Sequence, residues 1–377
     1  MATTIKLETL LAGFALASGK PGEKVPTSTQ GIVTSEDGER LVQVLDGISE
    51  SVLNHLPSVR ESQTDHLVIV LHRSGSVDVY ANEVKIAAQV IAKCAVNVGE
   101  TVRLDDIADT RAVVLEGVEI PEDAGVIVLF SARWRKGVFY DFSPLHDIQR
   151  RRSGAELQRA ITGLWTYLQF QDRVALTQSD WEAFQKSNWF PFVGLPTGLL
   201  RKMLSQARAN WDIDELLGDI AANISDRLPK LRELFSRASL FDGHRSVFLK
   251  ALEHFEAKDH MSAVCLLYPR IEGLLRRQHT TTNDGGARIS QQVLSASAVT
   301  DATGLRHENS LLLPLRFEEY LQEVYFANFD PSAPRGVGRN TVGHGVAPEN
   351  ELNAKSATLG ILIAEQIAFL SGGTRRT

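Results

Sequence analysis

The stretch VIVLFSARWRKGVFYDF, residues 126–142, decides what kind of fold the first part of the chain has. Two arms rich in β-branched and aromatic residues flank Arg135-Lys136-Gly137, and such arms are typical of neighbouring strands. Glycine can take the positive φ that a tight turn needs, so we place the turn at these three residues. The sequence therefore predicts a β-hairpin here.

More strands are expected upstream of this hairpin. Strand-like runs occupy 66–72, 76–80, 111–120 and 125–131. The apolar residues of 40–56 recur at helical spacing and predict one amphipathic helix before the strands. We therefore expect residues 1–150 to form an α/β domain, which could act as a sensor or regulator.

Beyond residue 150 the apolar period changes from about two to about 3.6. The run Arg150-Arg151-Arg152-Ser153-Gly154 predicts an exposed linker, with a nucleic-acid contact as the alternative. Predicted helices follow at 155–171, 179–187, 197–209, 212–226, 228–239, 244–258, 260–278, 308–328 and 349–371. Breaks are expected at Pro191, Pro196, Pro229, Asp242-Gly243 and 284–286. The fold class expected is mainly α: an α/β domain (1–150), a helical connecting region (151–240) and a C-terminal helical bundle (241–377).

Charge, cysteine content and hydropathy argue against a broad nucleic-acid-binding surface, a zinc site and a membrane span. A net charge of -6 argues against a broad basic surface, so any nucleic acid should be met in a local pocket. The two cysteines, Cys94 and Cys265, lack zinc-ligand spacing, and we expect a reducing compartment, no metal and no cofactor. The apolar patch 10–17 is too short to cross a bilayer and follows an acidic Glu8, so we expect a cytoplasmic protein without membrane contact.

The glycine-rich region near residue 340 resembles a phosphate-binding loop only superficially. Gly338 and Gly343 have the GxxxxG spacing, but His344-Gly345 stands where such a loop needs Lys followed by Ser or Thr. No predicted strand precedes it, so we reject this interpretation.

The same region contains Arg339-Asn340-Thr341-Val342-Gly343-His344. An arginine followed closely by a histidine also occurs at Arg60–His66 and Arg237–His244, so spacing alone decides nothing. Only the copy at residues 339–344 lies between two long apolar segments that must bury a face. A polar loop would thereby be fixed between two buried helices.

With this context the C-terminal third, about residues 241–377, resembles the HEPN superfamily, helical bundles whose active members carry R-x(4–6)-H, often R-N-x(3)-H, near the last helix. The segment Tyr268–Arg276, YPRIEGLLR, resembles an earlier helix of that fold. The resemblance implies an endoribonuclease with catalytic Arg339 and His344, and with Asn340 in its polar position. It further implies a homodimer with a composite active site. Large HEPN proteins act in prokaryotic antiviral and abortive-infection systems, which suggests a toxin or defence role.

The chemistry is reasonable without the family. RNA carries its own nucleophile, the 2′-hydroxyl, so cleavage needs only proton transfer and charge stabilisation. Histidine titrates near neutrality and can serve as general acid or base, while arginine forks onto phosphate oxygens without a metal. Arg270 and Glu272 are candidates for supporting this site. They are two residues apart on one predicted helix, so at most one of them should face it.

Two alternatives stay open: a non-catalytic binding module, and a scaffold assembled through the tryptophan-containing middle of the chain around Trp165 and Trp181. Arg339 could pair with a buried carboxylate, Glu272 or Glu319, and His344 could cap a helix. The bundle would then be a non-catalytic module that binds a nucleotide or a protein. If residues 339–344 were helical, Arg339 and His344 would lie about 140° apart, but the nearby glycines favour a loop.

Overall fold

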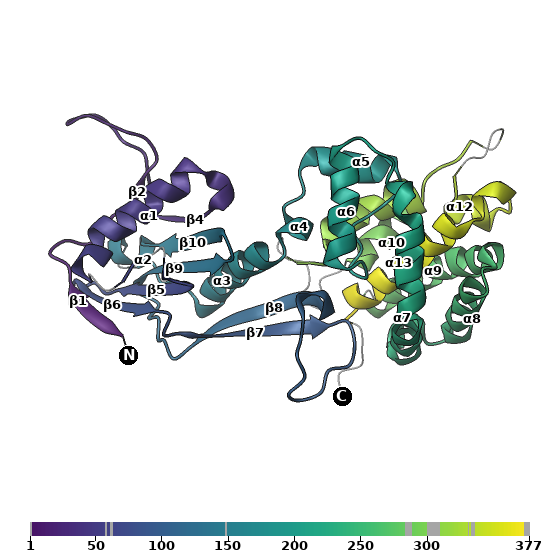
Figure 1. Cartoon of the computed structure of the whole chain (residues 1–377), viewed down its shortest axis with the longest axis horizontal. Helices are drawn as coiled ribbons and strands as arrows, with labels where there is room; N and C mark the ends of the chain where they lie inside the picture. Colours follow the sequence, from purple (N-terminus) through teal and green to yellow (C-terminus); the bar gives the residue numbers. More distant parts are fainter. Residues whose placement is uncertain are drawn as a thin grey trace. The chain divides into compact units, whose positions relative to one another are not determined.

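The computed structural model describes residues 2–56, 59–60, 63–147, 149–282, 289–299, 310–330, 332 and 336–372. The chain divides into two compact units (Figure 1). The first comprises Met1–Val90 and Thr110–Gln171, and the second comprises Ile91–Asp109 and Asp172–Thr377. The bounds of these units differ from those of the three predicted regions, 1–150, 151–240 and 241–377. The division into three domains stays a prediction.

The first unit is built on an antiparallel sheet of six strands in the order β1-β6-β5-β9-β10-β4. Its strands are β1 (Thr3–Lys6), β4 (Gln30–Thr34), β5 (His66–Leu71), β6 (Ser76–Ala81), β9 (Gly125–Ala132) and β10 (Arg135–Asp141). Two small pairs accompany it: β2 (Phe14–Ala15) with β3 (Thr27–Ser28), and β7 (Lys85–Ala92) with β8 (Ile107–Glu116). The tip of the β7–β8 hairpin belongs to the second unit.

Helices cover both faces of this sheet. On one face α1 (Glu39–Ser51) buries Leu41, Val44 and Ile48 against alternate strand residues such as Ile69. On the other face α3 (Gly154–Gln169) packs against the intervening residues, including Val68. Because the central strands are buried on both faces, their sequences read as continuous apolar runs rather than as alternating ones.

The predicted hairpin is confirmed, but its turn lies elsewhere. Ala132 pairs with Arg135, so the turn residues are Arg133 and Trp134, and Arg133 takes the positive φ of 61°. Gly137 lies inside β10. A Cβ there would come within 2.5 Å of the Leu164 side chain of α3. The glycine therefore allows a helix to approach the sheet closely and does not form the turn.

The predicted exposed linker at residues 150–154 is wrong at its centre. Arg152 is buried, its guanidinium lies 3.3 Å from the Asp141 carboxylate, and it donates to the carbonyl of Ala124 at 3.2 Å. Ser153 then starts α3 with a capping box that it forms with Glu156. Because Arg152 is buried and paired with Asp141, it is part of the packed structure of the first unit. Residues 150–154 therefore do not form a free linker.

The second unit is helical apart from the hairpin tip. Its helices are α4 (Gln171–Val174), α5 (Gln178–Lys186), α6 (Thr197–Arg208), α7 (Leu217–Arg237), α8 (Arg245–Glu256), α9 (His260–Thr282), α10 (Gln291–Ala298), α11 (Pro314–Tyr320), α12 (Arg339–Gly343) and α13 (Ala354–Leu370), with a π-helical turn, η8 (Leu321–Tyr325), after α11. Helix α9 packs against α8, α10, α12 and α13, and α13 also packs against α7. Short 3-10 turns such as η5 (Ile213–Leu216) and η9 (Glu349–Glu351) also belong to this unit, whereas the short helix α2 (Ser143–His146) belongs to the first unit.

Several predicted helices need correction. Pro229 does not break the chain, because α7 runs through it as one helix. Helices α10 and α12 were not predicted. Residues 349–353 precede the last helix rather than belonging to it. The predicted break at 284–286 and the start of the predicted helix 308–328 lie outside the described residues.

The predicted fold class, mainly α, is wrong. Helices make up 51% of the structure and strands 17%, and a six-stranded antiparallel sheet organises the N-terminal half. The protein is a mixed α/β protein with substantial helical content. The sequence pattern underestimated the sheet because its two edge strands, β1 and β4, are short and lack a strong apolar period.

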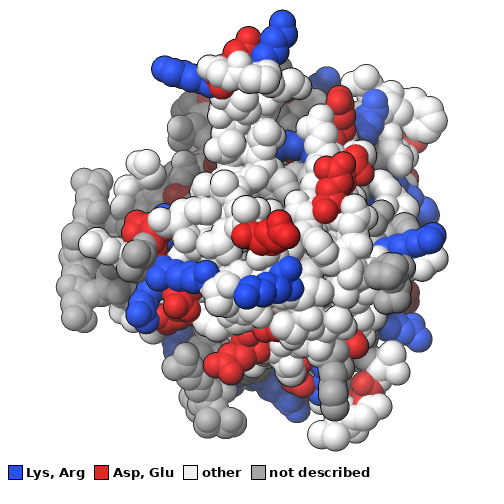
Figure 2. Space-filling model, turned by 90° about the vertical axis from the view of Figure 1, so that its left-hand side faces the viewer, with Lys and Arg blue, Asp and Glu red and all other residues white. Residues whose placement is uncertain are grey.

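None of the helices in the described part of the chain is both long enough and apolar enough to cross a bilayer. Figure 2 shows one face of the molecule, on which acidic and basic side chains are interspersed rather than gathered into one basic surface.

Candidate functional site

The arginine–histidine motif forms a short helix, not the expected loop. Helix α12 begins at Arg339, and the Gly338 amide donates to the Thr341 hydroxyl at 3.0 Å. A Cβ at Gly338 would lie 3.0 Å from the Tyr325 carbonyl oxygen, so the glycine lets the helix start directly against η8. Gly345, at φ 69°, follows His344 and ends the helix.

Two hydrogen bonds hold the Arg339 guanidinium along the edge that carries Nε and Nη1. Its Nε donates to the Glu272 carboxylate, and its Nη1 donates to the Asn340 side-chain oxygen at 3.1 Å. The guanidinium lies over Gly343, where an added Cβ would be 3.9 Å from Cζ, Nε and Nη1. Among the described residues no hydrogen bond uses Nη2. Glu319, the other carboxylate considered from sequence, pairs with a different arginine.

Of the two supporting candidates on α9, only Glu272 reaches the motif. Glu272 is buried and accepts from both Arg339 and Arg276, the latter at 2.6 Å. Arg270 is exposed and lies near His244 on another side of the helix. Two guanidinium groups therefore share one carboxylate, which leaves this cluster with a net positive charge next to solvent.

Asn340 uses its complete hydrogen-bonding capacity. Its side-chain nitrogen donates to the carbonyls of Phe326 and Ala327, at 3.0 and 3.1 Å. Its side-chain oxygen accepts from Arg339 and from Gln291 of α10, the latter at 2.8 Å. Since an amide offers two donors and two acceptor sites, Asn340 orients the arginine and anchors α12, and it contacts neither the imidazole nor solvent.

His344 directly follows the last residue of α12 and caps the helix. Its residue is exposed, its ring centroid is 5.8 Å from that of Phe329, and its amide donates to the Asn340 carbonyl at 3.1 Å. The imidazole forms no hydrogen bond with another described residue. The structure thus combines a fixed guanidinium whose Nη2 no described residue uses with an accessible imidazole five residues later, on the residue that caps the same short helix.

Sequence reasoning missed a second arginine–histidine cluster. His244 packs beneath Gly273 of α9, where a Cβ would lie 2.9 Å from its ring. Burial, and next the charges of Arg270 and Arg277, lower the pKa of His244. Its Nδ1 is buried without a hydrogen-bond partner among the described residues. The sequence feature that could have revealed this cluster is the spacing of Arg270, Gly273 and Arg277, which share a face of one helix.

A third cluster, also missed, surrounds Lys93 in the hairpin tip. Lys93 lines a cavity of about 160 Å³, together with Glu365 of α13, Arg227 of α7 and Asp105. Burial, and next the neighbouring Arg173 guanidinium, lower the pKa of Lys93 to about 7. No local sequence feature could reveal this, because the cations that crowd Lys93 come from distant helices.

We expect Lys93 to react with amine reagents at neutral pH. With a pKa of about 7, roughly half of its amine is neutral at pH 7, whereas an ordinary lysine titrates at about 10.4. Acetylation by an activated ester, followed by peptide mass spectrometry, should give a Lys93 rate that levels off above about pH 8. The rate of an ordinary lysine keeps rising about tenfold per pH unit over this range. A Lys93 rate that also rose tenfold per unit up to pH 9 would contradict the assignment.

Within the described residues no group of three or more His, Cys, Asp or Glu side chains could hold a metal ion. The interpretation of the site therefore depends on its own geometry. Comparison of the chain with known proteins found no matching family model, no similar curated protein and no similar solved structure.

Proposed function

We propose that the protein is a metal-independent endoribonuclease of the toxin or defence type, with Arg339 binding phosphate and His344 transferring protons. One observation carries the proposal: Arg339, with an Nη2 that no described residue uses, begins one short, anchored helix, and the exposed His344 caps its end. Because the two side chains of one copy point about 140° apart around the helix, a shared site would need the His344 of a second copy. The HEPN-like motif supports the same assignment, and the toxin or defence role rests on that resemblance alone.

The chain's own groups can supply the first proton transfer and the charge stabilisation of this reaction. His344 takes the proton from the ribose 2′-hydroxyl, whose oxygen attacks the adjacent phosphorus. The bond between phosphorus and the 5′-oxygen breaks, and that oxygen leaves as a hydroxyl after it takes a proton from water or from the protonated His344 of a second copy. Arg339 donates from Nη2 to the phosphate oxygens and stabilises the charge that develops there. The products are a 2′,3′-cyclic phosphate, or a 3′-phosphate after hydrolysis, and a 5′-hydroxyl.

Glu272 and Asn340 would position the guanidinium in this reaction. They bind Nε and one N–H of Nη1, so Nη2 is the guanidinium nitrogen that no described residue uses and that can turn toward a substrate. A preoriented donor loses little freedom when the phosphate arrives, which favours transition-state stabilisation. Asn340 is thus assigned a positioning role at the polar position that the resemblance gives it.

One imidazole per chain supplies only one of the two proton transfers. A two-fold dimer places the same residue on both sides of its axis, so a second His344 could complete the site. The exposure of residues 343–346 is compatible with such a dimer. A cytosolic nuclease also needs restraint, and we assign a regulatory role to the first unit.

One observation favours a second candidate, a binding module that cuts nothing. The buried Glu272 neutralises part of the Arg339 charge, as in a purely structural ion pair. Such a module would hold a nucleotide or a protein through the net positive charge of the cluster. It would tolerate loss of His344.

The test uses purified full-length protein, total cellular RNA and EDTA, with end-group analysis of the fragments. We expect cleavage that leaves cyclic-phosphate or 3′-phosphate ends and 5′-hydroxyl ends. Sedimentation of the same preparation should give the mass of a dimer. Fragments with 5′-phosphate ends, or cleavage that requires a divalent metal, would overturn the proposed chemistry.

A further inference from the structure

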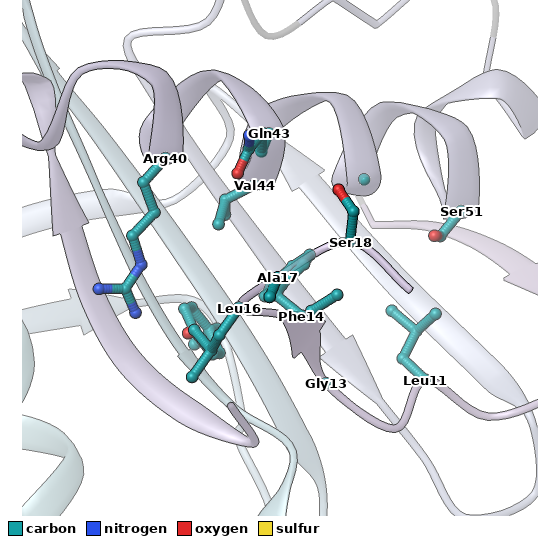
Figure 3. Close-up of a pocket in the computed structure, with 13 residues that line it drawn as sticks. Leu11, Gly13, Phe14, Leu16, Ala17, Ser18, Arg40, Gln43, Val44 and Ser51 are labelled. Carbon is teal, nitrogen blue, oxygen red and sulfur yellow. The ribbon is translucent and has the colours of Figure 1, made fainter. Parts of the chain in front are cut away.

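The first unit contains a pocket of about 540 Å³ between α1 and the chain segment that includes β2 (Figure 3). This volume lies within the range of about 300–1,000 Å³ that small-molecule sites occupy. All residues that line the pocket belong to the first unit, so its geometry does not depend on the second unit.

Apolar and aromatic side chains form most of the wall. Phe14 meets Tyr140 edge to face, with ring centroids 4.7 Å apart, and Leu16 lies at the rim with 51% of its surface exposed. Val44 contributes from α1. Gly47 lets Phe14 approach the helix, because an added Cβ would lie 3.1 Å from the Phe14 ring. A flat apolar molecule would bury the exposed part of Leu16 and gain free energy from it.

Tyr140 and Arg40 contribute polar groups to this wall. The Tyr140 hydroxyl is buried and makes no hydrogen bond with any described residue, an arrangement that costs stability. Arg40 is the only charged side chain among the residues that line the pocket, and no carboxylate in the described part of the chain pairs with it. In Figure 3 the Arg40 guanidinium extends toward Leu16 and the pocket. The pocket thus has an excess of positive charge beside an apolar wall.

We propose that this pocket binds a small organic anion that has a flat apolar body and one oxyacid group. The oxyacid group pairs with Arg40, since a guanidinium forks onto such oxygens. The apolar body lies against Phe14, Leu16 and Val44. This inference does not depend on the proposed ribonuclease activity. It names the class of ligand through which the first unit would act as a sensor.

A matched pair of fluorescent probes tests the proposal on the full chain. 1-Anilinonaphthalene-8-sulfonate carries the anion, and N-phenyl-1-naphthylamine has the same aromatic body without it. We expect saturable binding of the sulfonate at one site per chain. Arg40→Gln should weaken it about tenfold, as a lost charge-assisted contact does, and leave the neutral probe within about twofold. Leu16→Ser should weaken both probes.

Arg159→Gln is the matched control, because Arg159 is exposed on α3 of the same unit and does not line the pocket. It should change neither probe. Circular dichroism shows whether each variant has kept its fold. Sulfonate binding that Arg40→Gln leaves unchanged would overturn the role of the anion. Binding insensitive to both Arg40→Gln and Leu16→Ser, or no saturable binding at all, would overturn the site.

Discussion

His344→Ala should lower the rate of RNA cleavage by about 10²–10⁴-fold, the range that general acid–base catalysis supplies. The side chain is exposed and makes no hydrogen bond with another described residue, so its removal should change the free energy of unfolding by less than about 0.5 kcal/mol. Activity and stability can therefore be separated at this position. Single-turnover cleavage of a labelled RNA measures the rate, and urea unfolding measures the stability.

Arg339 needs a more conservative change, because its removal would leave Glu272 with only Arg276 as a partner. Arg339→Lys keeps the charge but loses the planar fork that can hold Glu272, Asn340 and phosphate together. We expect a loss of about 10²–10³-fold in rate, as when one transition-state donor is removed. The fold should be retained, which circular dichroism checks.

Gly343→Ala is the matched control within the motif. Its φ is not positive, and the new Cβ would make ordinary contact with the Arg339 guanidinium at 3.9 Å, so cleavage should persist. His254→Ala, which removes a histidine paired with Asp259 outside the motif, should also remain active. Equal cleavage by His344→Ala and the wild type would assign the chemistry to other residues, whereas no cleavage by either protein would favour the binding module.

Glu365→Ala should destabilise the second unit by about 3–5 kcal/mol, as expected when one partner of a buried ion pair is removed. Glu365 is buried on α13 and accepts from both terminal nitrogens of Arg227, at 2.6 and 3.2 Å. Without it, Arg227 would lie uncompensated close to Lys93 and Arg173. Urea unfolding followed by tryptophan fluorescence reports on this unit, because the buried Trp189 belongs to it.

Glu256→Ala is the control for this prediction. Its carboxylate pairs with Arg232 at 2.5 Å on the surface, and more than half of its side chain is exposed, so its loss should cost no more than about 1 kcal/mol. A Glu365→Ala variant as stable as this control would mean that water already compensates Arg227. The glycine at position 194 fits this packing, because a Cβ there would come within 2.0 Å of the Glu365 carboxylate.

The positions of the helices and central strands could be predicted because periodicity is local. A run such as 66–72 or 260–278 shows from its own residues which face must be buried, and β5 and α9 form there. The hairpin at 126–142 was predictable for the same reason. Periodicity does not show which element covers a face, and for that reason Gly137 was assigned to the turn instead of to a close approach by α3.

The sequence by itself therefore determined the hairpin, the helical second half and the Arg339–His344 motif as a hypothesis. Only the tertiary structure decided that Glu272, 67 positions away, holds Arg339, that Asn340 is fully bonded, and that Arg152 is buried. It also decided the surroundings of Lys93 and the pocket beside Arg40. The physical reason is that hydrogen bonds, burial and charge act over a few ångströms in space, whereas a sequence pattern reports only on neighbours along the chain.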